Sequence, residues 1–156
     1  MSQTQQNKAS AVLQFAPPAP AVSEAYLFNK LSLYTDAADV AEDLKNRISG
    51  IVIVDTRAEA HYQRGHIPGA ISFPHRLITE ESTRQLNKEW VYVTYCDGIG
   101  CNGSTNGAYK LAKLGFRVKE LIGGLDFWTR DRHPLATGDE SGEYPADFNV
   151  EECGCS

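Results

Sequence analysis

The residues of this chain with the clearest potential for chemistry are two cysteines in a glycine-rich loop. Cys96 and Cys101 enclose the residues Asp-Gly-Ile-Gly, and the loop continues to Gly103. The residues before Cys96 have the pattern of a buried strand, and those after Gly103 have the pattern of a helix. Backbone N–H groups and the positive end of a helix dipole converge at such a junction and stabilise a thiolate. We therefore interpret Cys96 as a nucleophile in sulfur chemistry.

The role of Cys101 stays open from the sequence. Three alternatives are open: Cys101 packs under the loop, it forms a disulfide with Cys96 and so resolves the intermediate on that residue, or it holds the transferred sulfur itself. The loop glycines either make the segment flexible or turn its N–H groups toward the Cys96 sulfur. Ser104 or Thr105 is the expected N-cap of the following helix. The residues predicted to contact the substrate are Asp97, Gly98, Ile99, Gly100, Asn102, Gly103 and Ser104.

Two strands are predicted to position this loop. Residues 91–95 are all β-branched or aromatic, and residues 51–54 are four consecutive β-branched residues. The second pattern is typical of a strand covered on both faces, as in a parallel sheet. Sites in open α/β sheets lie just beyond the carboxyl ends of the strands, where Asp55 and Cys96 both stand.

The remaining segments alternate between helix and strand. One helix is expected to have Thr35 or Asp36 as its N-cap, to carry an apolar stripe of Val40, Leu44 and Ile48, and to stop at Gly50. Another, which carries Ala108, Leu111 and Ala112 on one face, is expected to end at Gly115. Further strands are predicted over 70–73 and 117–121, and further helices over 23–33 (or a short strand over 31–34), 58–63, 80–87 with Thr79 as its cap, and 125–130.

This alternation predicts an α/β fold, with a parallel sheet and helices on both of its faces. We expect one domain over residues 22–136. A disordered leader over 1–21, rich in Gln, Ala and Pro, precedes it, and an irregular tail over 137–156 follows it.

Composition narrows the function classes. The net charge of −5 gives no support for nucleic acid as a partner, and no apolar run is long enough to span a membrane. A signal peptide is not expected either, because Gln14 and three prolines interrupt the apolar patch over residues 9–21 and only Lys8 precedes it. Because a domain of this size needs no disulfide staple, we expect four reduced cysteines and a cytoplasmic location. Cys153 and Cys155 form a Cys-Gly-Cys tail that accepts sulfur, forms a disulfide, binds a soft metal or is inert.

Three segments together resemble the rhodanese-like family. They are residues 54–57 (Val-Asp-Thr-Arg) with 65–71 (Gly-His-Ile-Pro-Gly-Ala-Ile), Tyr95-Cys96 with its glycine loop, and residues 121–128 (Leu-Ile-Gly-Gly-Leu-Asp-Phe-Trp). The resemblance spans roughly residues 36–134. It implies a five-stranded parallel sheet and a sulfurtransferase in which Cys96 carries a persulfide. It implies neither a metal nor an organic cofactor.

The loop departs from the usual pattern of that family. It resembles a subgroup with a Cys-x-Gly-x-x-Cys-Asn-Gly loop, and no Lys or Arg lies between Val91 and Tyr109. A small sulfane-sulfur donor such as a persulfide, a monoanion, therefore fits better than thiosulfate, a dianion. The acceptor is a thiol or a protein, and its identity and the oligomeric state are not given by the sequence. Asp55, Arg57 and His66 are expected to support the site structurally.

Two other functions stay open on the same scaffold. A phosphatase or arsenate reductase requires an Arg that clamps the oxyanion, and Asn102 stands near that place instead. A redox-sensing module without catalysis would only switch Cys96 and Cys101 between thiols and a disulfide. The two readings of the cysteines differ in whether Cys96 ever holds an extra sulfur atom.

Overall fold

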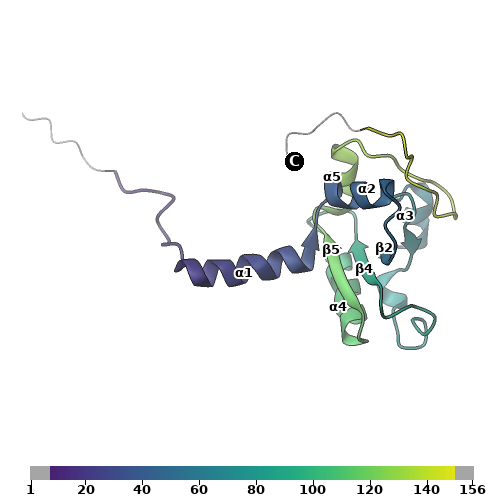
Figure 1. Ribbon diagram of the computed structural model, residues 1–156, viewed down its shortest axis with the longest axis horizontal. Helices are drawn as coiled ribbons and strands as arrows, with labels where there is room; N and C mark the ends of the chain where they lie inside the picture. Colours follow the sequence, from purple (N-terminus) through teal and green to yellow (C-terminus); the bar gives the residue numbers. More distant parts are fainter. Residues whose placement is uncertain (1–7, 150–156) are drawn as a thin grey trace, which may run out of the picture. The chain divides into compact units, whose positions relative to one another are not determined.

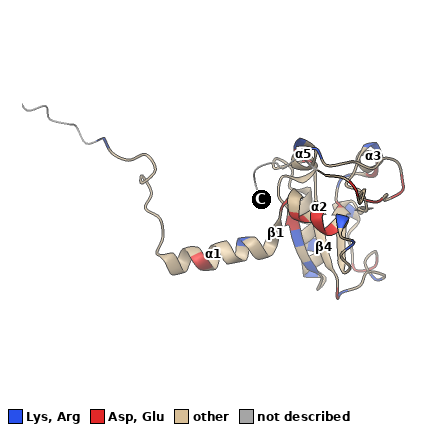
Figure 2. Ribbon diagram, turned by 45° about the horizontal axis from the view of Figure 1, so that its top comes forward, with Lys and Arg blue, Asp and Glu red and all other residues tan. Residues whose placement is uncertain are grey.

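A computed structural model describes residues 8–149, and the chain divides into two compact units. The residues up to Leu31 form the first unit and those from Ser32 form the second. Residues 8–19 form neither helix nor strand, and helix α1 (Pro20–Leu33) begins three residues before the predicted start. No residue of α1 is buried, and the helix is mostly uncharged (Figure 2). Nowhere along the described chain is a helix both long and apolar enough to cross a bilayer.

The second unit is built on a five-stranded parallel sheet (Figure 1). The strand order is β1-β5-β4-β2-β3, so the strand that leads to Cys96 lies in the centre. In the register of the two central strands, Asp55 is opposite Tyr95, which places both carboxyl ends at one edge. The predicted parallel α/β sheet is confirmed. Its strands are β1 (Tyr34–Thr35), β2 (Ile51–Asp55), β3 (Ile71–Ser72), β4 (Val91–Tyr95) and β5 (Arg117–Leu121).

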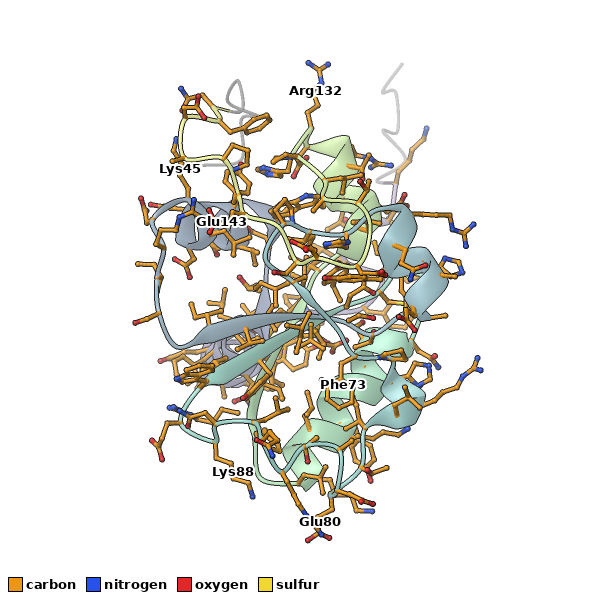
Figure 3. The ribbon with its side chains drawn as sticks, turned by 90° about the vertical axis from the view of Figure 1, so that its right-hand side faces the viewer. Lys45, Phe73, Glu80, Lys88, Arg132 and Glu143 are labelled. Carbon is orange, nitrogen blue, oxygen red and sulfur yellow. A yellow bond between two sulfur atoms is a disulfide. The ribbon has the colours of Figure 1, made fainter. Side chains whose placement is uncertain are left out.

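Each face of the sheet has its own apolar core, because successive side chains of a strand point to opposite faces. One core joins Ile53, Val93 and Tyr95 of the strands to three helices, α2 (Ala37–Lys45), α3 (Glu59–Arg64) and α5 (Gly124–Arg130). The other joins Val54 and Tyr92 to helix α4 (Gly103–Lys113) and the segment after β3. Figure 3 shows side chains filling both layers. The central strands are therefore covered on both sides, as the β-branched run predicted.

Helix α2 (Ala37–Lys45) is shorter than predicted. Asp36 caps it, with Oδ1 accepting the N–H of Asp39 at 2.9 Å, which confirms one of the two expected caps. The helix stops before Ile48, which is 51% exposed and does not belong to its apolar stripe. The change of direction comes at Arg47, a non-glycine residue with a φ of 54°, and the predicted stop at Gly50 is wrong.

The helix predicted over residues 80–87 is absent, and this segment forms successive turns after a short 3₁₀ helix, η1 (His75–Leu77). Thr79 and Ser82 exchange hydrogen bonds, with each hydroxyl accepting the N–H of the other residue at 2.9 and 3.1 Å. Thr83 Oγ1 donates to the carbonyl of Thr79 at 2.8 Å. These side chains satisfy the backbone groups that a helix would have paired, so the polar cluster favours turns.

Residues 137–149 contain no helix or strand, yet they pack onto the helices and strands of the second unit. His66 and Ala136 form an antiparallel bridge, and Gly69 N–H donates to the carbonyl of Ser141 at 2.7 Å. Tyr144 is buried in the core. Lys45, which is labelled in Figure 3, donates from Nζ to the carbonyl of Phe148 at 3.1 Å. Cys153 and Cys155 lie outside the described residues.

We expect His133 to make the stability of this region depend on pH. Its ring lies 4.5 Å from the Trp128 ring, and Nδ1 is 3.2 Å from the Tyr144 hydroxyl. Burial lowers the pKa of His133 below its ordinary value of 6.5, against a smaller opposing effect of Asp131. Because the unfolded state then binds the proton more tightly, protonation favours unfolding, and stability falls as the pH falls through and below that ordinary value.

We expect His133→Gln to reduce this dependence. The measurement is the free energy of unfolding in urea at about pH 7.5 and about pH 5.5. The decrease between the two pH values should be smaller in the variant than in the natural chain. An equal decrease in both proteins would assign the dependence to other groups.

Candidate active site

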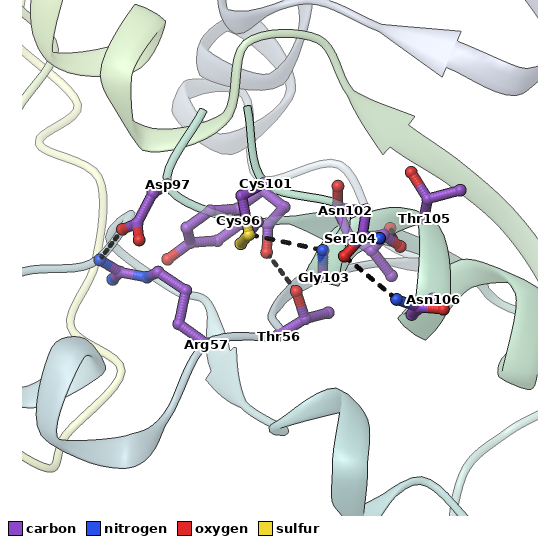
Figure 4. Close-up of a disulfide and its surroundings, with 12 residues drawn as sticks. Thr56, Arg57, Cys96, Asp97, Cys101, Asn102, Gly103, Ser104, Thr105 and Asn106 are labelled. Atoms are coloured by element: carbon purple, nitrogen blue, oxygen red, sulfur yellow. Dashed lines mark hydrogen bonds and ion pairs between the residues drawn. A yellow bond between two sulfur atoms is a disulfide. The ribbon is translucent and has the colours of Figure 1, made fainter. Parts of the chain in front are cut away.

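Cys96 lies directly after β4, and its Sγ is bonded to Sγ of Cys101 in a disulfide (Figure 4). The two Cα atoms are 6.2 Å apart. Cys96 is only 4% exposed, whereas Cys101 is partly exposed. The expectation that these cysteines are reduced is thus wrong for this state of the chain. Of the roles left open for Cys101, the disulfide with Cys96 is the one that the structure contains.

The loop is held at its start by the N-terminus of α5. Leu125 N–H donates to the carbonyl of Cys96 at 2.9 Å, and Asp126 N–H donates to the carbonyl of Asp97 at 2.8 Å. Gly124 has a φ of 55°, and a Cβ atom there would overlap the carbonyl oxygen of Cys96. Only glycine satisfies both conditions. The glycine pair at the start of α5, Gly123 and Gly124, was a signal for this contact that our sequence reasoning did not use.

Helix α4 begins at the other end of the loop, and its N-cap is Asn102, not Ser104 or Thr105 as predicted. Gly103 N–H donates to Cys101 Sγ at 3.4 Å, so the start of α4 faces the disulfide. Ser104 Oγ and Thr105 Oγ1 donate instead to Oε1 of Glu120, at 3.1 and 2.7 Å. Substrate contact by Ser104 stays a prediction, and its hydroxyl is already engaged in this structure.

The central strands approach closely beneath the loop. Thr56 donates to the carbonyl of Tyr95 from both its N–H, at 3.0 Å, and its Oγ1, at 2.8 Å. A Cβ atom on Gly107 would lie 2.7 Å from Cγ2 of Thr56, so a side chain there would push α4 away from β2. Thr56 therefore fixes the end of β4 and the packing of α4. It is a positioning residue that our sequence reasoning did not single out.

Arg57 and Asp55 form a buried ion pair next to the loop. Arg57 Nη2 is 2.6 Å from Asp55 Oδ2, and Arg57 Nε is 3.0 Å from Asp55 Oδ1. Both side chains are at least 94% buried, and the Tyr95 hydroxyl donates to Asp55 at 2.8 Å. Arg57 Nη1 also reaches Oδ1 of Asp97 at 3.1 Å (Figure 4). A cation distant in sequence thus contacts the residue next to Cys96.

These contacts shift the pKa values of Arg57 and Tyr95. Burial alone lowers the pKa of Arg57, but its hydrogen bonds to Asp55 and the charge of Asp55 outweigh that effect and raise it, so Arg57 stays cationic. Burial, followed by the negative charge of Asp55, raises the pKa of Tyr95, which stays neutral and donates its proton. Asp55, Arg57 and Asp97 together carry one net negative charge.

His66 contacts the backbone of two segments of the second unit. Its Nδ1 is 2.8 Å from the carbonyl of Tyr62, and its Nε2 is 3.0 Å from the carbonyl of Glu140. The imidazole stacks on the Tyr62 ring with centroids 3.6 Å apart. His66 is fully buried, so it connects α3 to the C-terminal segment.

A hollow of about 450 Å³ opens at Cys96. The segment after β2 and η1 form its walls, and His75 and Arg76 come from η1. Burial, together with Lys110 and Arg76, lowers the pKa of His75, which keeps its imidazole neutral near neutral pH. Lys110 Nζ donates to the carbonyl of His75 at 2.8 Å. In the described residues, no cluster of His, Cys, Asp or Glu has the geometry to hold a metal ion.

Gly103 leaves space beside the two sulfur atoms that a side chain would fill. A Cβ atom at this position would lie 3.0 Å from Cys96 Sγ and 3.4 Å from Cys101 Sγ. We expect Gly103→Ala to slow alkylation of the reduced Cys96 by iodoacetamide about tenfold, since small displacements at a reacting atom have effects of this size. Gly100→Ala is the matched control, because a Cβ there meets no atom within 4 Å. Equal rates in the two variants would contradict the close contact.

The fold and this site define a class of protein. The family model of the rhodanese-like domain matches residues 40–131, more than half of the chain, and the chain belongs to that family. The BH2092 protein of Bacillus halodurans is similar in structure, with a TM-score of 0.75 and 41% identity, over 85% of this chain and 96% of that one. SseA of Escherichia coli, described as a 3-mercaptopyruvate sulfotransferase, shares the fold at a TM-score of 0.59 and 24% identity, over 76% of this chain and 57% of that one.

A relative in Mycobacterium tuberculosis is named as a transcriptional regulator and not as an enzyme. The protein named HTH-type transcriptional regulator Rv0324 is 35% identical over 106 residues, which are 66% of this chain and 46% of that protein. This chain thus spans about half the length of that curated relative. The similarity applies to the shared segment and not to the whole regulator.

Proposed function

We propose that this protein is a sulfurtransferase that moves sulfane sulfur through a persulfide on Cys96. The observation that carries the proposal is the position of Cys96 at the carboxyl end of β4, beside a hollow and next to the start of α4. Membership of the rhodanese-like family, which includes sulfurtransferases, supports the same assignment. The proposed acceptor is a thiol, and the proposed location is the cytoplasm, where thiols are abundant.

The proposed cycle has two transfer steps. The Cys96 thiolate attacks the outer sulfur of a persulfide, the donor S–S bond breaks, and the donor leaves as a thiolate. Cys96 then holds the extra sulfur in a new S–S bond. An acceptor thiolate attacks this outer sulfur, takes it away as a new persulfide, and returns Cys96 as a thiolate.

Cys101 adds a branch to the cycle. In a Cys96 persulfide, the thiolate of Cys101 attacks Cys96 Sγ and expels hydrosulfide, which leaves the disulfide between the two residues. This branch explains the disulfide without a separate oxidant, because the sulfane sulfur accepts the two electrons. We assign Cys101 to this resolving role.

The charges around the hollow favour a monoanionic donor. Arg57 faces both Asp55 and Asp97, so its positive charge is more than balanced. Arg76 lines the hollow together with Glu59, and His75 is neutral. Little net positive charge is left for a dianion such as thiosulfate. A persulfide on a small thiol is therefore the proposed donor.

The test is the intact mass of the reduced protein after brief exposure to a persulfide. We expect the natural chain and Cys101→Ser to gain one sulfur atom, and Cys96→Ser to gain none. Cys101→Ser should keep the added sulfur longer, since it cannot resolve the persulfide. Uptake that disappears in Cys101→Ser but persists in Cys96→Ser would move the nucleophile to Cys101.

The disulfide itself supports a second candidate function, a redox-sensing module that does not transfer sulfur. The name of the mycobacterial relative is compatible with such a role for the shared segment. The same mass measurement separates the two functions. A chain that never gains sulfur but loses two hydrogen atoms on mild oxidation would be a sensor.

A further inference from the structure

The disulfide borders two hollows, and the proposed function uses only one of them. A second hollow of about 550 Å³ lies between the loop and α5. Asp97 and Cys101 line both hollows, whereas Cys96 lines only the first. The second hollow is completed by Ile99 and by Leu125 and Asp126 of α5. An incoming group on this side therefore meets Cys101.

The second hollow has a distinct charge. Asp97 and Asp126 line it, and no Lys or Arg is among its lining residues. Asp97 shares Arg57 with the buried Asp55, so the three groups are already net negative. Asp126 lies against the loop backbone, where its Oδ2 would be 3.3 Å from a Cβ atom on Gly98. The side that reaches Cys101 is thus anionic, while the first hollow contains charges of both signs.

Exposure also distinguishes the two sulfur-bearing residues. Cys96 is 4% exposed and lies under the N-terminus of α5, whereas Cys101 is partly exposed. Thiol–disulfide exchange requires access to the attacked sulfur. Attack on Cys101 frees Cys96 as the leaving thiolate, which is the form that begins the next cycle.

We propose that the second hollow binds the thiol that reduces the disulfide, that this thiol stands beside a positive charge, and that it attacks Cys101. The proposal rests on the proposed function for the origin of the disulfide. The incoming thiolate forms a bond to Cys101 Sγ, and the Cys96–Cys101 bond breaks. A second thiol then attacks the mixed disulfide, so that two thiols are oxidised to one disulfide and both cysteines are reduced.

The first measurement compares cysteamine, which is cationic, with mercaptoacetate, which is anionic, as reductants of the Cys96–Cys101 disulfide. Rates are expressed per thiolate and divided by the rate of the same thiol with a small, uncharged disulfide. We expect this corrected ratio to favour cysteamine. Asp126→Asn should lower the preference for cysteamine about threefold, as for an exposed charge pair. Glu59→Gln, which removes a charge from the first hollow, should leave the preference for cysteamine unchanged.

The second measurement identifies the attacked sulfur. The reaction is quenched with iodoacetamide before it is complete, and the loop peptide is sequenced by mass spectrometry. We expect the incoming thiol on Cys101 and the alkyl group on Cys96. The reverse arrangement, a corrected ratio of one, or equal effects of Asp126→Asn and Glu59→Gln would each overturn the proposal.

Peptides distinguish a small thiol from a protein thiol. Lys-Cys-Lys and Glu-Cys-Glu amides replace the small thiols, and Ile99→Ser is added because Ile99 is 75% exposed at the rim. If the natural reductant is a protein segment, Ile99→Ser should slow reduction of the disulfide by the basic peptide but not reduction by cysteamine. None of these measurements needs a sulfur donor. A chain that passes them but never gains sulfur would keep this binding site and lose the proposed sulfurtransferase function.

Discussion

Cys96→Ser is expected to reduce sulfur transfer from a persulfide to a thiol by at least about a thousandfold. A serine hydroxyl is a much weaker nucleophile than a thiolate and cannot store the sulfur between the two steps. The measurement is kcat/KM with saturating acceptor, with the transferred sulfur measured as the new persulfide. Cys101→Ser is the matched control, and its rate should stay within about tenfold of the natural chain, since it lacks only the resolving branch.

The comparison of these two variants separates two roles. If both lose activity to the same extent, the cysteines act as one redox pair, and a persulfide held by Cys96 alone is not the intermediate. If only Cys96→Ser loses activity, Cys96 carries the sulfur. Circular dichroism of each variant checks that the fold is unchanged, because Cys96 is almost fully buried.

Asp55→Ala is expected to destabilise the second unit by about 3–5 kcal/mol, because it leaves the Arg57 guanidinium buried without its main partner. The carboxylate also accepts the hydroxyl proton of Tyr95, so the substitution removes two kinds of contact. The measurement is urea unfolding with linear extrapolation. Asp55→Asn keeps the shape and an acceptor oxygen but removes the charge. Its free energy of unfolding should lie between those of the natural chain and Asp55→Ala.

The exposed ion pair of Arg47 and Glu143 provides the control. Its atoms are 3.4 Å apart, and the side chains are 52% and 83% exposed. We expect Glu143→Ala to change the free energy of unfolding by less than about 1 kcal/mol, since water and salt screen such pairs. If Asp55→Ala cost no more than this control, the buried pair would not be the brace that the geometry indicates.

The sequence predicted the scaffold well, because its signals are local. The β-branched run of 51–54 predicted the central strand β2, and the alternation in 91–95 predicted β4. The end of α4 was found from Gly115, which has a φ of 91°. Short-range chemistry determines these features, so one segment at a time is enough to find them. The failed helix over 80–87 is also local, since its Ser and Thr side chains compete for the backbone.

The site was less predictable, because tertiary contacts assemble it. The absence of Lys and Arg near the loop suggested a site without cations, yet Arg57 reaches Asp97 from 40 residues away. Likewise, the carbonyls of Cys96 and Asp97 are held by α5, and the hollow at Cys96 is walled by η1. These contacts depend on which strands are neighbours in the sheet, and linear spacing does not encode that.

The C-terminal segment contributes to the fold although the family model does not match it. The family match ends at residue 131, but Trp128 Nε1 donates to the carbonyl of Pro134 at 2.8 Å, and Gly69 N–H depends on Ser141. A proteolytic fragment that ended at residue 131 would keep every described strand and both loop cysteines. It would nevertheless uncover Trp128 and remove the carbonyls of Glu140 and Ser141 from His66 Nε2. Such a fragment should bind hydrophobic dyes and aggregate. The folded unit therefore extends beyond the segment that the family model matches.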